Sequence, residues 1–160
     1  MIKLVLFDLD GVLIDAKSIH YDALNEALGE KYYITEEEHH NLYDGLKTRE
    51  KLNMLTEYKG LPSEKHNEVF EAKQKITIEK VLKLKPIKEI KELFVELENN
   101  NYAIGVCTNS IRRTALTALS KTDLIEHCSI VLSNEDVKNS KPHPEIYWKA
   151  MSMMKVLPEE

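Results

Sequence analysis

The sequence contains no apolar run that approaches the roughly 20 residues needed to cross a bilayer. It has only two cysteines, Cys107 and Cys128, which lack metal-ligand spacing, so we expect free thiols in a reducing cytoplasm. An excess of positive charge is also missing, because the formal net charge is -5. We therefore expect no membrane partner and no nucleic-acid partner, and an anionic substrate would need locally placed cations.

The composition is that of a globular protein, with 42% hydrophobic and 31% charged residues in a chain of 160. Short apolar runs at residues 2–7, 102–107 and 129–132 are typical of strands buried in a parallel sheet. Helical patterns separate the later runs, and this alternation predicts an α/β fold with a Rossmann-like parallel sheet.

Residues 34–84 differ from the rest, since they are rich in Glu, Lys, His and Asn and contain no strand-like run. A helical stripe over residues 17–28 precedes them. We interpret residues 16–84 as an inserted all-helical cap. Residues 1–15 and 85–160 would then form an α/β core.

Three polar clusters follow the predicted strands: Asp8 with Asp10, Thr108 with Asn109, and Lys141 in a proline-flanked turn. The carboxyl ends of parallel strands are where open α/β sheets bind ligands. We therefore expect these clusters to meet at one edge of the sheet.

Asp8 and Asp10 are two residues apart, so in extended backbone they project to the same side. Two close carboxylates ionise readily only beside a cation, and Mg²⁺ favours carboxylate, water and phosphate oxygens. Asp8 would attack phosphorus as a nucleophile, and Asp10 would act as general acid and base. The alternatives are an acidic turn without chemistry or a calcium loop, but the twelfth loop position is Ile19 instead of Glu.

Thr108 and Asn109 offer hydroxyl and amide groups that suit a phosphate cradle, although the same residues also suit a simple helix cap. Lys141 would neutralise Asp8 and the transferring phosphoryl group. Its alternative is a solvated surface lysine.

Residues 7–13, 107–110 and 140–145 resemble, in order and spacing, the first three signature motifs of the haloacid dehalogenase superfamily. The resemblance implies a Rossmann-like core, a Mg²⁺ cofactor, an aspartyl-phosphate intermediate and a cap hinged near Asp15 and Lys85. It assigns the nucleophile, acid/base, phosphate binder and stabilising cation to Asp8, Asp10, Thr108 and Lys141. Asp8 and Asp10 would also bind the metal.

Within this superfamily the chain most resembles the helical-cap branch of β-phosphoglucomutase and phosphoglycolate-phosphatase-like enzymes. Gly45 followed by Arg49 matches a cap pattern that contacts substrate there, and His20 lies where the mutases have a histidine near the hinge. Arg49 would grip a second anionic group of the substrate. Both residues are also compatible with ordinary helix positions.

The family's fourth motif, an acidic loop after the next strand, is absent from this sequence. Glu135 and Asp136 precede Lys141 and do not replace it. The missing motif predicts weak Mg²⁺ binding and poor activity of the 160-residue chain. An exposed apolar sheet edge at residues 2–7 would also lead to self-association or instability.

The leading hypothesis is a hydrolase of a small phosphorylated metabolite, a phosphate monoester. A β-phosphoglucomutase-like mutase is the alternative within catalysis, since nothing in the sequence separates water from sugar as acceptor. A binding module on a non-catalytic phosphatase remnant is the alternative outside catalysis.

Overall fold

The computed structural model describes residues 1–160, apart from the side chain of Lys17. The chain divides into an α/β unit of residues 1–15 and 81–160 and a helical unit of residues 16–80. The second boundary lies four residues before the expected position after residue 84, and the last helix of the insertion ends one residue beyond it, at Val81.

The α/β unit contains, in chain order, β1 (Leu4–Phe7), α5 (Lys88–Asn99), β2 (Ala103–Cys107), α6 (Arg112–Lys121), β3 (Ile130–Leu132) and α7 (Glu145–Met154). Short turns of 3₁₀ helix lie at Ile125–His127 and Asn134–Asp136. The helical unit contains α1 (Lys17–Leu28), α2 (Glu36–Glu38), α3 (Thr48–Lys59) and α4 (His66–Val81). Single turns at Glu30–Tyr32, His39–Tyr43 and Ser63–Lys65 connect these helices.

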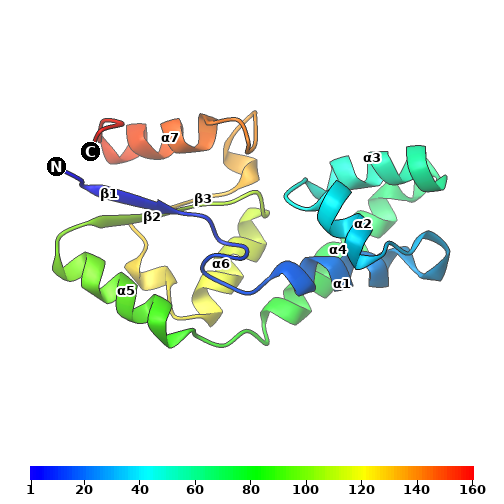
Figure 1. Ribbon diagram of the computed structural model, residues 1–160, viewed down its shortest axis with the longest axis horizontal. Helices are drawn as coiled ribbons and strands as arrows, with labels where there is room; N and C mark the ends of the chain where they lie inside the picture. The colour runs from blue at the N-terminus through cyan, green and yellow to red at the C-terminus, as the bar shows by residue number, and fades with distance from the viewer. The chain divides into compact units, whose positions relative to one another are not determined.

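The three strands form one parallel sheet in the order β1-β2-β3. Leu4 lies opposite Ala103, and Gly105 lies opposite Ile130. Figure 1 shows α7 on one side of this sheet and α5 on the other. The predicted fold class, an α/β parallel sheet with a helical insertion, is confirmed.

β2 is the central strand, and its last four residues are buried. The apolar run at residues 2–7 predicts a strand buried on both faces, but in β1 only Leu4 is buried. The difference arises because β1 lies at the edge of the sheet and pairs with β2 alone. Along its outer edge, the N–H groups of Lys3 and Leu4 donate to the carbonyl of Glu160.

Gly105 is required by the close approach of the neighbouring strands. A Cβ atom at this position would lie 2.5 Å from Leu6 Cδ2 and 2.8 Å from Ile130 Cγ2. Side chains from β1 and β3 therefore fill the space over the middle of β2 and leave no room for a side chain there.

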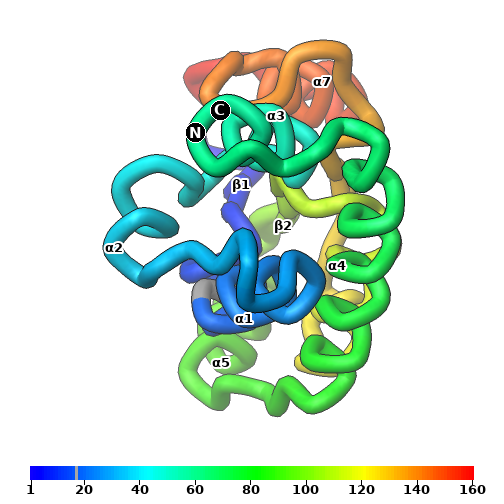
Figure 2. The backbone as a smooth tube through the Cα atoms, turned by 90° about the vertical axis from the view of Figure 1, so that its right-hand side faces the viewer, coloured from blue at the N-terminus to red at the C-terminus, as the bar shows by residue number. Residues whose placement is uncertain are grey.

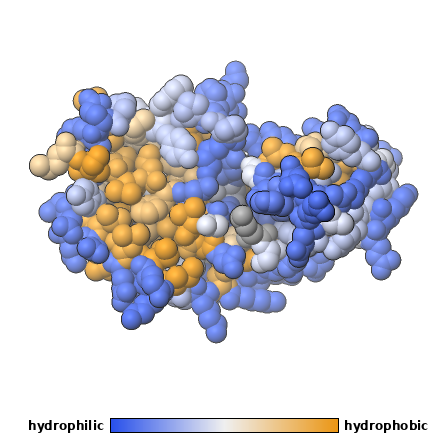
Figure 3. All heavy atoms as spheres, viewed as in Figure 1, coloured by the Kyte–Doolittle hydropathy of each residue, from blue (hydrophilic) through white to orange (hydrophobic). Residues whose placement is uncertain are grey.

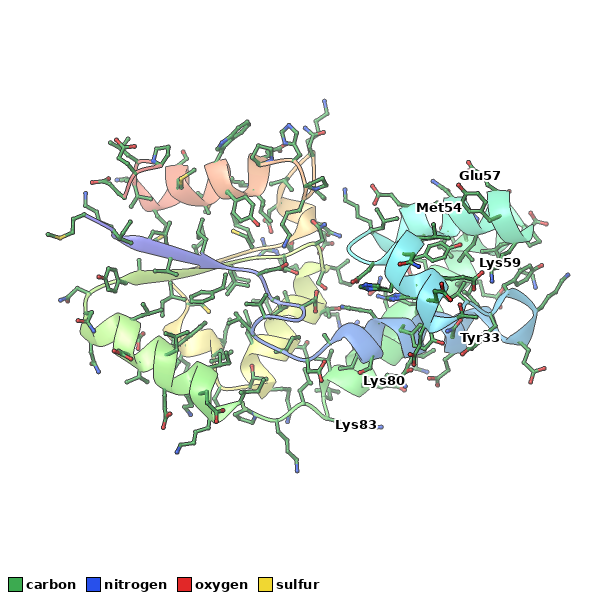
Figure 4. The ribbon with its side chains drawn as sticks, in the orientation of Figure 1. Tyr33, Met54, Glu57, Lys59, Lys80 and Lys83 are labelled. Carbon is green, nitrogen blue, oxygen red and sulfur yellow. The ribbon has the colours of Figure 1, made fainter. Side chains whose placement is uncertain are left out.

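The helical unit has a hydrophobic core of its own, which includes Leu24, Leu52 and Leu55. Figure 2 follows its chain from α1 to α4. Lys59 of α3 donates to the Tyr33 carbonyl at 2.7 Å (Figure 4), and it also pairs with Glu38, the last residue of α2. The unit contains no strand among its described residues.

Apolar side chains gather over the strands and α5 on the face of the α/β unit that Figure 3 shows. Ile2, Leu93 and Val95 are among the large apolar residues exposed in this unit. Within the described residues, no helix combines the length and the apolar character that a membrane span requires.

Candidate active site

Asp8 directly follows β1 and forms an ion pair with Lys141. Its Oδ1 atom lies 2.6 Å from the Lys141 Nζ atom and also accepts the Leu9 N–H at 2.7 Å. Among the described residues, the Asp8 Oδ2 atom takes part in no hydrogen bond. One oxygen is thus held in place, while the second remains accessible on a side chain that is 40% exposed.

Lys141 lies in the loop between β3 and α7, and its ammonium group reaches back to the end of β2. There it donates to the Cys107 carbonyl at 3.1 Å. The Lys141 side chain is only 15% exposed, so it is not the solvated surface lysine that the sequence left open. Burial of the Cys107 thiol raises its pKa to about 11, and the nearby charge of Lys141 opposes this shift only in part.

Asp10 is held by the turn after β2. The Ser110 hydroxyl donates to the Asp10 Oδ2 atom at 2.7 Å, and the Thr108 hydroxyl lies 3.5 Å from the same oxygen. Gly11 has a φ of 77°, a left-handed conformation that favours glycine and turns the chain directly after Asp10. Hydroxyl groups from the end of β2 therefore meet a carboxylate from the end of β1.

Asn109 binds the backbone of Lys141 with both ends of its side-chain amide. The Nδ2 atom donates to the Lys141 carbonyl at 3.0 Å, and the Oδ1 atom accepts the Lys141 N–H at 3.1 Å. The loops that follow β2 and β3 are thus linked directly. The sequence predicts a phosphate contact for this amide, but here these hydrogen bonds go to protein backbone.

Ser110 is the residue of this site that sequence reasoning missed, since the sequence analysis assigns a role in chemistry only to its neighbours Thr108 and Asn109. The N-cap of α6 is Ile111, whose side chain makes no capping hydrogen bond, and the first N–H of the helix, that of Arg112, donates to Glu135. The signal for a different role was its position in a Thr-Asn-Ser run at a strand end.

Glu135 and Asp136 lie in the turn after β3, and they bind the start of α6, while Asp136 also accepts hydrogen bonds from Ser133. Glu135 accepts the backbone N–H of Arg112 at 2.6 Å, and Asp136 pairs with the Arg112 guanidinium. Burial opposes ionisation of Asp136, but hydrogen bonds from Ser133 and the guanidinium hold its pKa below the usual value. These acids therefore stabilise the turn after β3.

Arg49 and His20 belong to the helical unit. The Arg49 guanidinium lies 4.6 Å from the centre of the Phe70 ring and donates to Asn67 at 3.3 Å. His20 Nδ1 lies 3.3 Å from the Lys73 Nζ atom.

The structure brings five of the predicted site residues together within the α/β unit: Asp8, Asp10, Thr108, Asn109 and Lys141. It holds the other two, Arg49 and His20, in the helical unit. The proximity expected from the strand ends is therefore present for the three polar clusters.

The donor set at Asp8 and Asp10 suits a hard cation, because carboxylate oxygens are preferred ligands of Mg²⁺. No group of three or more His, Cys, Asp or Glu side chains in the described part of the chain could hold a metal ion by itself. An ion bound by these two carboxylates would complete its coordination with water and substrate oxygens.

The sequence model that describes haloacid dehalogenase-like hydrolases matches residues 5–160. The chain belongs to the haloacid dehalogenase-like hydrolases. The predicted family and enzyme class are confirmed by this match. The phosphorylated carbohydrates phosphatase of Thermotoga maritima is 30% identical to this hydrolase over 162 residues, which cover 98% of the chain and 72% of the relative. Pyrophosphatase PpaX of Bacillus cereus is 27% identical, with 99% and 72% covered.

Solved structures of the same type superimpose on this hydrolase. β-Phosphoglucomutase from Clostridium difficile aligns with a TM-score of 0.86 and 25% identity, covering 99% of this chain and 74% of its own. CbbY from Rhodobacter sphaeroides, in complex with phosphate, aligns with a TM-score of 0.88 and 21% identity, covering 99% and 75%. The second likeness supports the fold alone.

Proposed function

We propose that this hydrolase is a Mg²⁺-dependent phosphatase that cleaves a small phosphate monoester through an aspartyl-phosphate at Asp8. The observation that carries the proposal is the 2.6 Å ion pair between Asp8 and Lys141 at the carboxyl end of the sheet. A lysine in this position offsets the negative charge of the nucleophile as it approaches an anionic phosphoryl group.

In this mechanism Asp8 Oδ2 forms a bond to phosphorus while the bond from phosphorus to the ester oxygen breaks. Asp10 gives its proton to the departing oxygen and later takes one from the water whose oxygen attacks phosphorus. In that second step the bond from phosphorus to Asp8 Oδ2 breaks, so inorganic phosphate leaves and the Asp8 carboxylate is restored. The Ser110 hydrogen bond at 2.7 Å keeps the Asp10 carboxylate in a fixed orientation for both transfers.

Lys141 neutralises charge on the transferring group, and the buried Thr108 hydroxyl binds one of its oxygens. A magnesium ion bound by Asp8 and Asp10 would supply further charge neutralisation. Because the described residues offer no larger cluster of metal ligands, we expect its affinity to be low.

We propose that the helical unit is a cap that selects the substrate and that Arg49 and His20 contact it. The proposed substrate is a small phosphorylated sugar. Support comes from the Thermotoga maritima relative, which is named a phosphorylated carbohydrates phosphatase, at 30% identity. The likeness to a β-phosphoglucomutase at 25% identity keeps a phosphosugar mutase as the second candidate.

The first experiment measures p-nitrophenyl phosphate hydrolysis with and without Mg²⁺. Asp8→Asn should abolish the metal-dependent turnover, since an amide is a poor nucleophile. Asp123→Asn is the matched control, because it changes an exposed aspartate that lies after α6 and pairs with Lys91. Full activity of Asp8→Asn would refute the mechanism.

A second experiment separates the two acceptors. With β-glucose 1-phosphate, a phosphatase releases inorganic phosphate and glucose, whereas a mutase yields glucose 6-phosphate. Binding of the sugar phosphate without either product, together with inactivity towards p-nitrophenyl phosphate, would indicate a binding module instead of an enzyme.

A further inference from the structure

Lys141 is held at both ends by the segment that terminates β2. Its ammonium group donates to the Cys107 carbonyl at 3.1 Å. Its backbone N–H and carbonyl are both bound by the side chain of Asn109, which lies two residues after Cys107. A flexible lysine stem is thereby fixed at its root as well as at its tip, which limits where the charge can lie.

The orientation of the Asn109 amide follows from its two partners. The amide oxygen must face the Lys141 N–H and the amide nitrogen must face the Lys141 carbonyl, because the reversed orientation would place like groups together. The side-chain oxygen and one side-chain N–H of Asn109 are therefore committed to Lys141.

Asn109 is itself anchored by the segment after β3. The Asn134 side chain donates to the Asn109 carbonyl at 2.8 Å, and the Asn134 N–H donates to the Ser110 carbonyl at 3.3 Å. The turn after β2 is thus held in place by the segment that leads to the Lys141 loop. Small displacements of Asn109 would be passed to the lysine backbone.

We infer that Asn109 is a positioning residue for Lys141: its amide clamps the lysine backbone so that the ammonium group stays 2.6 Å from Asp8. The inference rests on the proposed function for its effect on catalysis, whereas the clamp itself can be tested without turnover. It assigns these two hydrogen bonds of the amide to the protein backbone and not to substrate phosphate.

The structural part of the test measures the hydrogen-exchange rate of the Lys141 backbone N–H by NMR. Loss of its acceptor in Asn109→Ala should speed exchange about fivefold to tenfold. Asn109→Asp retains an oxygen acceptor for this N–H, so protection should return. Asn100→Ala is the matched control, because it removes a side-chain amide bond to the Glu96 carbonyl at the end of α5.

The kinetic arm uses p-nitrophenyl phosphate and a double-mutant cycle. Asn109→Ala should lower kcat about tenfold to a hundredfold with little change in KM, since a misplaced charge weakens mainly the transition state. When Lys141→Met is already present, the same change should cost nothing further. Asn109→Asp should give an intermediate kcat, because the Lys141 carbonyl remains without its donor.

The inference is overturned if Asn109→Ala exchanges and turns over like the Asn100→Ala control. It is also overturned if Asn109→Ala lowers kcat by the same factor in the wild-type chain and in the Lys141→Met variant. If Asp8→Asn and Lys141→Met keep full activity, the proposed function fails, but the exchange measurement still decides whether the clamp exists.

Discussion

Replacing Gly105 with alanine should destabilise the α/β unit through overpacking. The added Cβ would lie 2.5 Å from Leu6 Cδ2 and 2.8 Å from Ile130 Cγ2. Carbon atoms normally rest about 3.5–4.0 Å apart, so both neighbouring strands would have to move. Extra methylenes in a packed core cost about 1–3 kcal/mol. The lower entropy of an unfolded alanine chain offsets about 0.4–1 kcal/mol of this.

The net loss should be about 1–2 kcal/mol of unfolding free energy, which corresponds to a shift of about 0.5–1 M in the urea midpoint at a typical slope. Trp148, the single tryptophan, lies in α7 of the same unit and provides a fluorescence signal for the transition. Leu6→Ala should partly rescue Gly105→Ala, because it removes the shorter contact. Wild-type stability of Gly105→Ala, or strictly additive effects of the two changes, would refute this packing account.

Three further outcomes are expected. Asn25→Ala should lower the free energy of unfolding by about 2–4 kcal/mol, measured by far-UV circular dichroism melts. The change leaves the buried N–H and carbonyl of Ile34, which Asn25 binds at 2.8 and 2.9 Å, without their hydrogen-bond partner. An unchanged melt would contradict this. Burial and the Lys51 charge lower the pKa of His39 to about 4. An unfolded histidine titrates near 6.5, so stability should fall as the pH drops from about 6.5 to 4. His39→Gln should flatten that pH dependence, and an equally steep dependence would disprove the assignment. Finally, the edge position of β1 predicts concentration-dependent association in sedimentation velocity, and a monomer at every concentration would argue against it.

Much of the α/β unit could be predicted because its elements carry simple periodic patterns. The helical stripe over residues 17–28 corresponds to α1, and the helical patterns expected between the later apolar runs include α6. The rule that parallel strands present their carboxyl ends at one edge of the sheet predicts from sequence alone that Asp8 and Lys141 lie close together. For this pair, the positions of the polar residues after the predicted strands are sufficient to predict the contact.

The hydrogen-bond partners of the loop after β2 could not be predicted in the same way. Whether Ser110 caps a helix or binds Asp10 depends on the position of a carboxylate far away in the sequence. The same holds for the Asn109 amide, whose partners lie on Lys141. Short polar side chains bond to whatever backbone or carboxylate is nearest, so tertiary structure decides their roles.

The inner boundaries of the helical unit were also beyond sequence reasoning. Residues 36–43 begin as an α-helical turn at Glu36–Glu38 and continue as a π-helical turn at His39–Tyr43. The wider turn coincides with the burial of His39 and Tyr43, which face a local packing demand that periodicity does not encode.

The insertion of the helical unit between β1 and β2 has a consequence for how the molecule reaches its native state. The β1–β2 pairing joins Leu4 to Ala103, which are far apart in the sequence, whereas the β2–β3 pairing joins Gly105 to Ile130, which are much closer in the sequence. Closing a loop costs only about 0.6 kcal/mol more for each doubling of its length, so the insertion adds little to the equilibrium cost. It does raise the contact order, and we expect β1 to dock late, after β2 and β3 have paired. Asp8 would then be the last of the site residues to arrive during refolding.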